Sequence, residues 1–122
     1  MAEACVETEE LTLEVIRTAC EVGVTWLGRA EGPDQADVFG PVLEQLLVEA
    51  KKTPRPVKMH FEGVKHFNST TLMHVMTFLT RAEADGVRVV VTYDADRKWQ
   101  RLAFRAVERM GLPSDLVEVH GL

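Results

Sequence analysis

Four small polar residues, Asn68-Ser69-Thr70-Thr71, form the stretch of this sequence with the most evident chemical potential. They stand between an apolar segment and an amphipathic one, a position typical of a helix start. Asn68 suits the N-cap, because its side-chain oxygen can accept from a backbone N–H two or three residues later. The three hydroxyl residues would then occupy the first helical turn, where unpaired N–H groups and the helix dipole stabilise a phosphate. The cluster therefore indicates either a phosphorylation site or only a well-capped helix.

Other chemistry has little support in the sequence. The histidines are His60, His66, His74 and His120. They show no zinc-site spacing, and the chain has no glycine-rich phosphate-binding motif, so we expect no metal and no cofactor. His66 lies three residues before Ser69, but a base–nucleophile pair across a helix cap is not a recognised catalytic geometry. We interpret the chain as a non-enzyme, with a hydrolase using Ser69 as the weaker alternative.

Length and composition indicate one globular domain. The 122 residues are 46% hydrophobic and 27% charged, with a net charge of −5. This balance argues against a nucleic-acid partner, and no apolar run is long enough to insert into a membrane. Residues 1–10 are acidic, lack the basic region of a signal peptide, and are predicted to form a flexible lead-in to a domain over 11–122. We expect a cytoplasmic protein in which Cys5 and Cys20 are reduced thiols.

The hydrophobic periodicity predicts alternating strands and helices. The predicted strands span residues 11–15, 22–28, 57–61, 87–91 and 116–119. The predicted helices span residues 34 or 37 to 51, 69–85 and 96–110. Strands that alternate with helices imply a parallel sheet, to which the first two strands add an antiparallel edge hairpin. The fold class is therefore α/β, with a mixed sheet and three main helices. The apolar run 87–91 predicts a central strand covered on both faces.

The third predicted helix is rich in arginine. Its apolar stripe is expected to comprise Trp99, Leu102, Ala103, Ala106, Val107 and Met110. Its cations are Arg97, Lys98, Arg101, Arg105 and Arg109, which we interpret as a solvated face, since aromatic residues are not interleaved as nucleic-acid binding requires. Phe104 lies off the stripe among these arginines, a composition typical of a binding anchor, although a partly buried rim residue fits equally well.

The order of elements and the hydroxyl cluster together resemble the STAS domain of bacterial anti-sigma-factor antagonists. In that family a strand leads to Asp-Ser-Ser-Gly-Leu at a helix start, and one hydroxyl is phosphorylated by a partner kinase. The matching stretch here is Asn68 to Leu72, and the Gly-Leu that commonly ends the family's last helix is matched by Gly111-Leu112. Asn68 replaces the usual Asp and Thr71 replaces the usual Gly.

Those departures are closer to a related group, the STAS-like biofilm-regulation phosphoproteins, whose motif is Asn followed by Thr and Ser. The resemblance extends to residues 37–42 and 93–98 and covers roughly residues 22–110. The antagonists imply Thr70 as the phosphoacceptor, whereas the second group implies Ser69, which we favour slightly. In that second group a kinase and a phosphatase set the phosphorylation state, and the unphosphorylated form activates a diguanylate cyclase.

The resemblance implies a small regulatory protein that acts by phosphorylation-controlled partner binding through the start of the second helix. Its implied partners are a Ser/Thr kinase of anti-sigma type, a phosphatase and a downstream effector. The candidate partner-binding residues are His66, Phe67, Met73, Arg97, Arg101 and Phe104. The alternative is a STAS scaffold that is never phosphorylated and serves as a fixed subunit of a transporter or a structural assembly.

Overall fold

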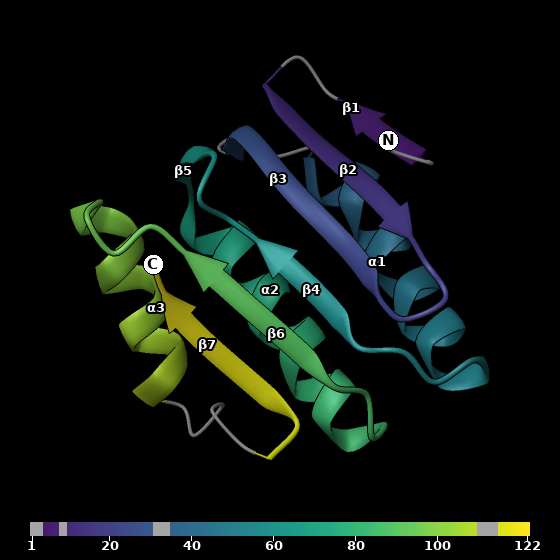
Figure 1. The fold of residues 1–122 in the computed structure, drawn as a ribbon. Helices are drawn as coiled ribbons and strands as arrows, with labels where there is room; N and C mark the ends of the chain where they lie inside the picture. The colour runs from purple at the N-terminus through teal and green to yellow at the C-terminus, as the bar shows by residue number, and fades with distance from the viewer. Residues whose placement is uncertain (1–3, 8–9, 31–34, 110–114) are drawn as a thin grey trace.

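The computed structural model describes residues 4–7, 10–30, 35–109 and 115–122, which form one mixed sheet of seven strands and three helices (Figure 1). The strands are β1 (Ala4–Glu7), β2 (Leu11–Arg17), β3 (Val22–Ala30), β4 (Val57–His60), β5 (Val64–Phe67), β6 (Val89–Tyr93) and β7 (Val117–Gly121). The helices are α1 (Gln35–Lys52), α2 (Ser69–Ala84) and α3 (Lys98–Arg109).

The strands lie in the order β1-β2-β3-β4-β6-β7, and β5 pairs with β3 outside this path. β1, β2 and β3 are antiparallel, whereas β3, β4, β6 and β7 are parallel, and a helix makes each crossover between them. The predicted α/β class, hairpin edge and parallel core are confirmed. The prediction of a flexible lead-in is wrong for Ala4–Glu7, because these residues pair with β2 as strand β1.

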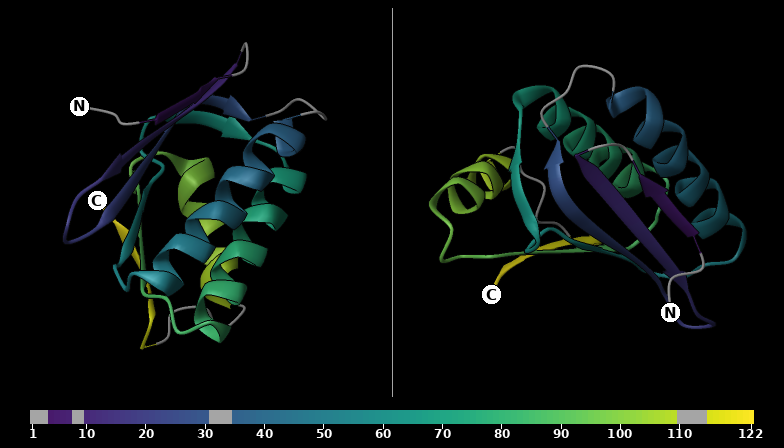
Figure 2. Two further views of the ribbon diagram at one scale, coloured as in Figure 1. Left: turned by 90° about the vertical axis from the view of Figure 1, so that its right-hand side faces the viewer. Right: turned by 90° about the horizontal axis from the view of Figure 1, so that it is seen from above.

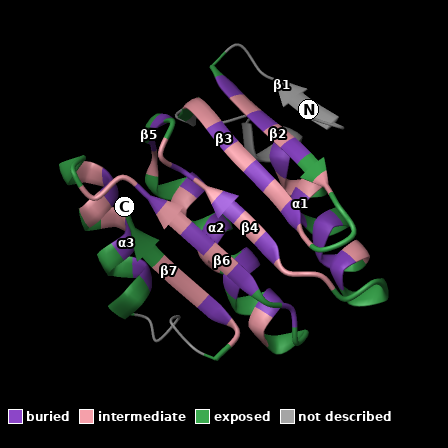
Figure 3. Cartoon of the chain, viewed as in Figure 1, coloured by how far each residue is buried: buried purple, intermediate pink, exposed green. Residues whose placement is uncertain are grey.

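All three helices lie on the same face of the sheet (Figure 2). Burial accordingly alternates along the strands, as Figure 3 shows. In β6, Val89, Val91 and Tyr93 are buried beneath the helices, while Val90 and Thr92 on the other face are partly exposed. The prediction that this strand is covered on both faces is therefore wrong. Its consecutive valines are typical of strand residues in general and do not report how many layers cover the sheet.

The core beneath α1 is aromatic. Trp26 in β3 is fully buried and contacts Phe39 of α1 edge-on, with ring centroids 5.4 Å apart, and Phe61 after β4 at 5.0 Å. The hairpin is also tied to α1 at its far end, where Arg17 donates two hydrogen bonds to Glu49, Nε to Oε2 at 2.8 Å and Nη2 to Oε1 at 3.2 Å. These hydrogen bonds lower the pKa of the Glu49 carboxyl below its usual value.

Several sequence predictions lie outside the described residues. They are the possible helix start at Asp34, the helix end at 110 and the Gly111-Leu112 match. Among the described residues, none of the helices combines the length and the apolar character that crossing a bilayer requires. Within the same residues, no group of three or more His, Cys, Asp or Glu is placed to hold a metal ion.

Candidate functional site

The hydroxyl cluster lies where β5 runs into α2. Asn68 has extended backbone angles, φ −81° and ψ 174°, and its Oδ1 accepts a hydrogen bond from the Thr71 backbone N–H at 2.9 Å. Its carbonyl accepts from the Leu72 N–H at 3.1 Å, so the first intrahelical bond begins here. The predicted N-cap is confirmed, and it assigns Ser69, Thr70 and Thr71 to the first three positions of α2.

The three hydroxyl residues differ in exposure. Ser69 and Thr70 are exposed, whereas Thr71 is buried, with 3% of its surface accessible. Because Thr71 is the third helical residue, its side chain turns toward the sheet while the first two point to solvent. Two hydroxyls are thus accessible to an enzyme, and they are the two that the sequence resemblance implies as phosphoacceptors.

Replacing Asn68 with alanine should lower the free energy of unfolding by about 1 kcal/mol, because the Thr71 N–H loses its acceptor. Asn68→Asp is the matched control: it keeps the acceptor and adds a negative charge that the helix dipole favours, so its stability should equal or exceed that of the unchanged chain. Urea unfolding followed by circular dichroism measures both. Equal destabilisation by the two variants would contradict the capping role.

Helix α3 begins beside this junction. The Trp99 ring lies 5.5 Å from the His66 ring and 5.0 Å from the Phe67 ring, which it meets edge-on. Arg97 donates through Nη1 to the Val64 carbonyl at 3.5 Å, and its Nε lies 3.3 Å from Oδ2 of Asp94. The structure therefore brings the predicted residues His66 and Arg97 to the same end of the sheet as the hydroxyl cluster.

Gln100 is a positioning residue that sequence reasoning missed. It is fully buried, and its Nε2 donates to the Phe61 and Val64 carbonyls, both at 2.9 Å. Its Oε1 accepts from the Asp94 N–H at 2.8 Å. One side chain thus ties the turn before β5 to the loop before α3, and so holds the strand that delivers Asn68. The available signal was an uncharged polar residue in register with Phe104 and Val107 on one helix face.

Two predicted partner-binding residues belong to the core. Phe104 is fully buried and stacks on Tyr93, with centroids 5.0 Å apart and an interplanar angle of 13°. Phe67 is 5% exposed. The predicted phase of α3 is also wrong: Gln100, Phe104 and Val107 are its buried residues, and Leu102 is 53% exposed. Phe104 therefore cannot serve as an exposed anchor.

Arg101 and Met73 have different surroundings. Arg101 is partly exposed and donates through Nη1 to the Ala95 carbonyl at 2.8 Å, so it bonds to the loop that precedes its own helix. Met73 is 67% exposed on the outer side of α2. A cavity of about 270 Å³ beside it is lined by Met73, Met76, Thr77, Thr80 and Arg81.

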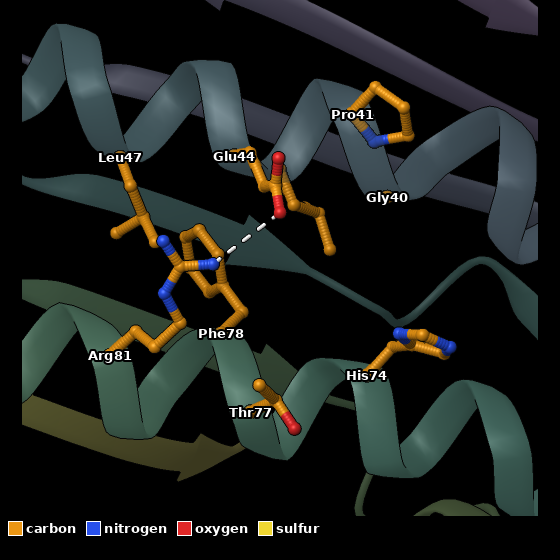
Figure 4. Close-up of a pocket in the computed structure, with 9 residues that line it drawn as sticks. Gly40, Pro41, Glu44, Leu47, His74, Thr77, Phe78 and Arg81 are labelled. Carbon is orange, nitrogen blue, oxygen red and sulfur yellow. Dashed lines mark ion pairs between the residues drawn. The ribbon is translucent and has the colours of Figure 1, made fainter.

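A groove separates the outer sides of α1 and α2 (Figure 4). Its volume is about 290 Å³, and it is lined by Gly40, Pro41, Leu43, Glu44, Leu47, His74, Thr77, Phe78 and Arg81. The ion pair between Arg81 Nη1 and Glu44 Oε1, 3.6 Å apart, spans it. The His74 ring packs edge-on against Phe39, with centroids 5.7 Å apart. His74 therefore belongs to the helix–helix contact.

Helical spacing relates each exposed hydroxyl to one of these hollows. Thr70 is four residues before His74 and continues the row of His74, Thr77 and Arg81 that lines the groove. Ser69 is four residues before Met73 and continues the row of Met73, Met76 and Thr80. The first turn of α2 is thus the upper end of a continuous exposed surface. We name this surface, from Ser69 and Thr70 through Met73 and His74 to Arg81, the α2 outer face.

In sequence, the chain matches no protein-family model and no curated protein. Two solved structures resemble it in fold. One is apo-SiaC from Pseudomonas aeruginosa, with a TM-score of 0.60 and 14% identity over 97% of this chain and 99% of that one. The other is a chain in the complex of diguanylate cyclase SiaD with its activator SiaC from Pseudomonas aeruginosa, with a TM-score of 0.59 and 17% identity over 97% and 100%. The chain therefore has the SiaC fold, and the predicted STAS-like architecture is confirmed.

Proposed function

We propose that this protein is a regulator that binds a protein partner through the α2 outer face and is switched by phosphorylation of Ser69 or Thr70. The observation that carries the proposal is the exposure of these two hydroxyls, at the dipole-positive start of α2, above an exposed methionine and a groove. The fold likeness to SiaC, the activator of a diguanylate cyclase, supports an effector enzyme as the partner class. The sequence resemblance supports a kinase and a phosphatase acting in the cytoplasm.

The switch would operate by local charge and bulk. A phosphate adds a charge of about −1.5 to −2 at pH 7. At the first turn of α2 the backbone N–H groups and the helix dipole favour that charge, so the fold survives modification. A partner seated over Met73 and the groove would meet a dianion at the upper end of its contact, and its affinity would fall. The bound state would therefore be the unphosphorylated one.

The test has two steps. Affinity purification from native cells followed by intact-mass and peptide mass spectrometry identifies the partner and any phosphorylated residue together. The affinity of that purified partner is then measured for Ser69→Ala, Thr70→Ala, Ser69→Asp and Thr70→Asp. We expect aspartate at the true acceptor to weaken binding by about tenfold or more, which corresponds to ~1.4 kcal/mol, and alanine to leave binding nearly unchanged.

Thr53→Asp is the matched control. Thr53 is an exposed hydroxyl residue that follows α1 at the opposite end of the sheet, so it receives the same charge away from the proposed contact. Its affinity should equal that of the unchanged protein. The proposal fails if none of the four variants changes the affinity. It also fails if Thr53→Asp weakens binding as much as they do, because the effect would then be one of net charge. Native protein that never carries phosphate would support the fixed scaffold instead.

A further inference from the structure

The outward side of α3 is a single narrow ridge. Lys98, Leu102, Arg105 and Arg109 follow one another at spacings of four, three and four residues, which places them on one helix face. All four are exposed, and they lie opposite the buried residues of the same helix. Leu102 is 53% exposed, with Lys98 before it and Arg105 after it. We name these four residues the α3 ridge.

The ridge concentrates positive charge on an acidic protein. Residues 97–109 contain five cations and one acid, Glu108, whereas the whole chain has a net charge of −5. In the described part of the chain, Arg97 pairs with Asp94, but Lys98, Arg105 and Arg109 make no ion pair. The ridge is therefore an uncompensated cationic surface with an apolar side chain within it.

Neither feature helps the isolated chain. Arg105 lies four residues from both Arg101 and Arg109, and like charges at this spacing repel each other on a helix surface. An exposed leucine contributes little to a folded core. Departures from local preference that the fold does not require are expected where a surface has a binding role.

We propose that the α3 ridge is a docking site for an acidic amphipathic helix of a partner protein. The partner's apolar row would cover Leu102, and carboxylates on both sides of that row would pair with Lys98, Arg105 and Arg109, the arginines offering bidentate geometry. This contact is independent of phosphorylation and lies on a different helix from the α2 outer face. It therefore adds a second surface to the proposed function.

A protein partner fits this surface better than nucleic acid does. A phosphate backbone would satisfy the cations but would offer no apolar contact to Leu102. The aromatic residue nearest the ridge, Trp99, is already packed between His66 and Phe67 and provides no stacking platform for bases. Leu102 thus distinguishes the two partner classes, and its contribution can be measured directly.

The test uses a synthetic helical peptide of about 16 residues that carries a row of leucines flanked by glutamates. A second peptide has serine in place of each leucine. Fluorescence anisotropy measures the affinity of both peptides for the full chain and for its Leu102→Ser and Arg105→Glu variants. We expect Arg105→Glu to weaken both peptides by about tenfold or more. We expect Leu102→Ser to weaken the leucine peptide several-fold and to leave the serine peptide unchanged, which isolates the apolar contact.

Two controls keep the result interpretable. Lys52→Glu makes the same charge change at the exposed end of α1 and should leave peptide affinity unchanged. Arg105→Glu should raise the midpoint of thermal unfolding, because it converts two repulsive pairs into attractive ones, so lost binding would not reflect lost folding. The proposal is overturned if the leucine peptide does not bind, if Lys52→Glu acts like Arg105→Glu, or if a DNA duplex binds more tightly than the peptide and Leu102→Ser has no effect. The α2 variants of the preceding section do not alter this assay, so the two proposals can fail separately.

Discussion

Replacing Phe104 with alanine should lower the free energy of unfolding by about 3–5 kcal/mol. The ring is fully buried and contacts three other rings: Tyr93 at 5.0 Å, Phe61 at 5.1 Å and Phe67 at 6.2 Å between centroids. These rings come from β6, from the turn after β4 and from β5, so the deletion would leave a cavity where α3 meets the sheet. Urea unfolding monitored by circular dichroism measures the loss.

Leu102→Ala is the matched control for this cavity. It removes an apolar side chain from the same helix two residues earlier, but that side chain is 53% exposed, so the cost should stay within about 0.5 kcal/mol. If the two variants destabilised the chain equally, the orientation of α3 described here would be wrong. The comparison also tests the sequence prediction directly, because the predicted phase of the helix reversed the roles of these two residues.

Replacing Gln100 with leucine should lower the free energy of unfolding by about 3 kcal/mol or more. The leucine is close in size, but it would leave the Phe61 carbonyl and the Asp94 N–H without the partner that Gln100 supplies, and it would remove one donor from the Val64 carbonyl. A buried polar group that loses its hydrogen bond costs about 1–3 kcal/mol. Gln45→Leu is the control, because Gln45 is exposed on α1 and should cost less than about 0.5 kcal/mol.

The same variant should loosen the approach to the candidate site. Gln100 fixes the turn that begins β5, and β5 ends at the cap of α2. Hydrogen exchange measured by mass spectrometry should therefore show faster exchange over residues 61–68 in Gln100→Leu, with β2 unaffected. Uniformly faster exchange across the sheet would mean that Gln100 supports the whole fold and has no special relation to the site.

Features that depend on neighbours in the chain could be predicted from the sequence. Asn68 caps α2 because a short side-chain acceptor lies three residues before an N–H that has no intrahelical partner. The hairpin of β2 and β3 follows from two alternating segments close in sequence, and the parallel core follows from strands that alternate with helices. These properties depend on local spacing and on chain connectivity, which are written in the order of residues.

Which side chains face the core could be decided only by the tertiary structure. In α3 both possible faces contain apolar residues, and the choice depended on the rings of Tyr93, Phe61 and Phe67 packing around Phe104. Covering of the sheet on one face, pairing of β1 and pairing of β5 with β3 likewise join segments whose contacts local periodicity does not specify.

The hydroxyl cluster divides along the same line. Its residue types and its place at a helix start were determined by the sequence alone, because capping requires particular side chains at particular spacings. The burial of Thr71, the exposure of Ser69 and Thr70, and the position of both above the groove were decided by how α2 packs on the sheet and beside α1. A hydroxyl acquires its chemistry from its own atoms, but access to it depends on what the rest of the chain covers.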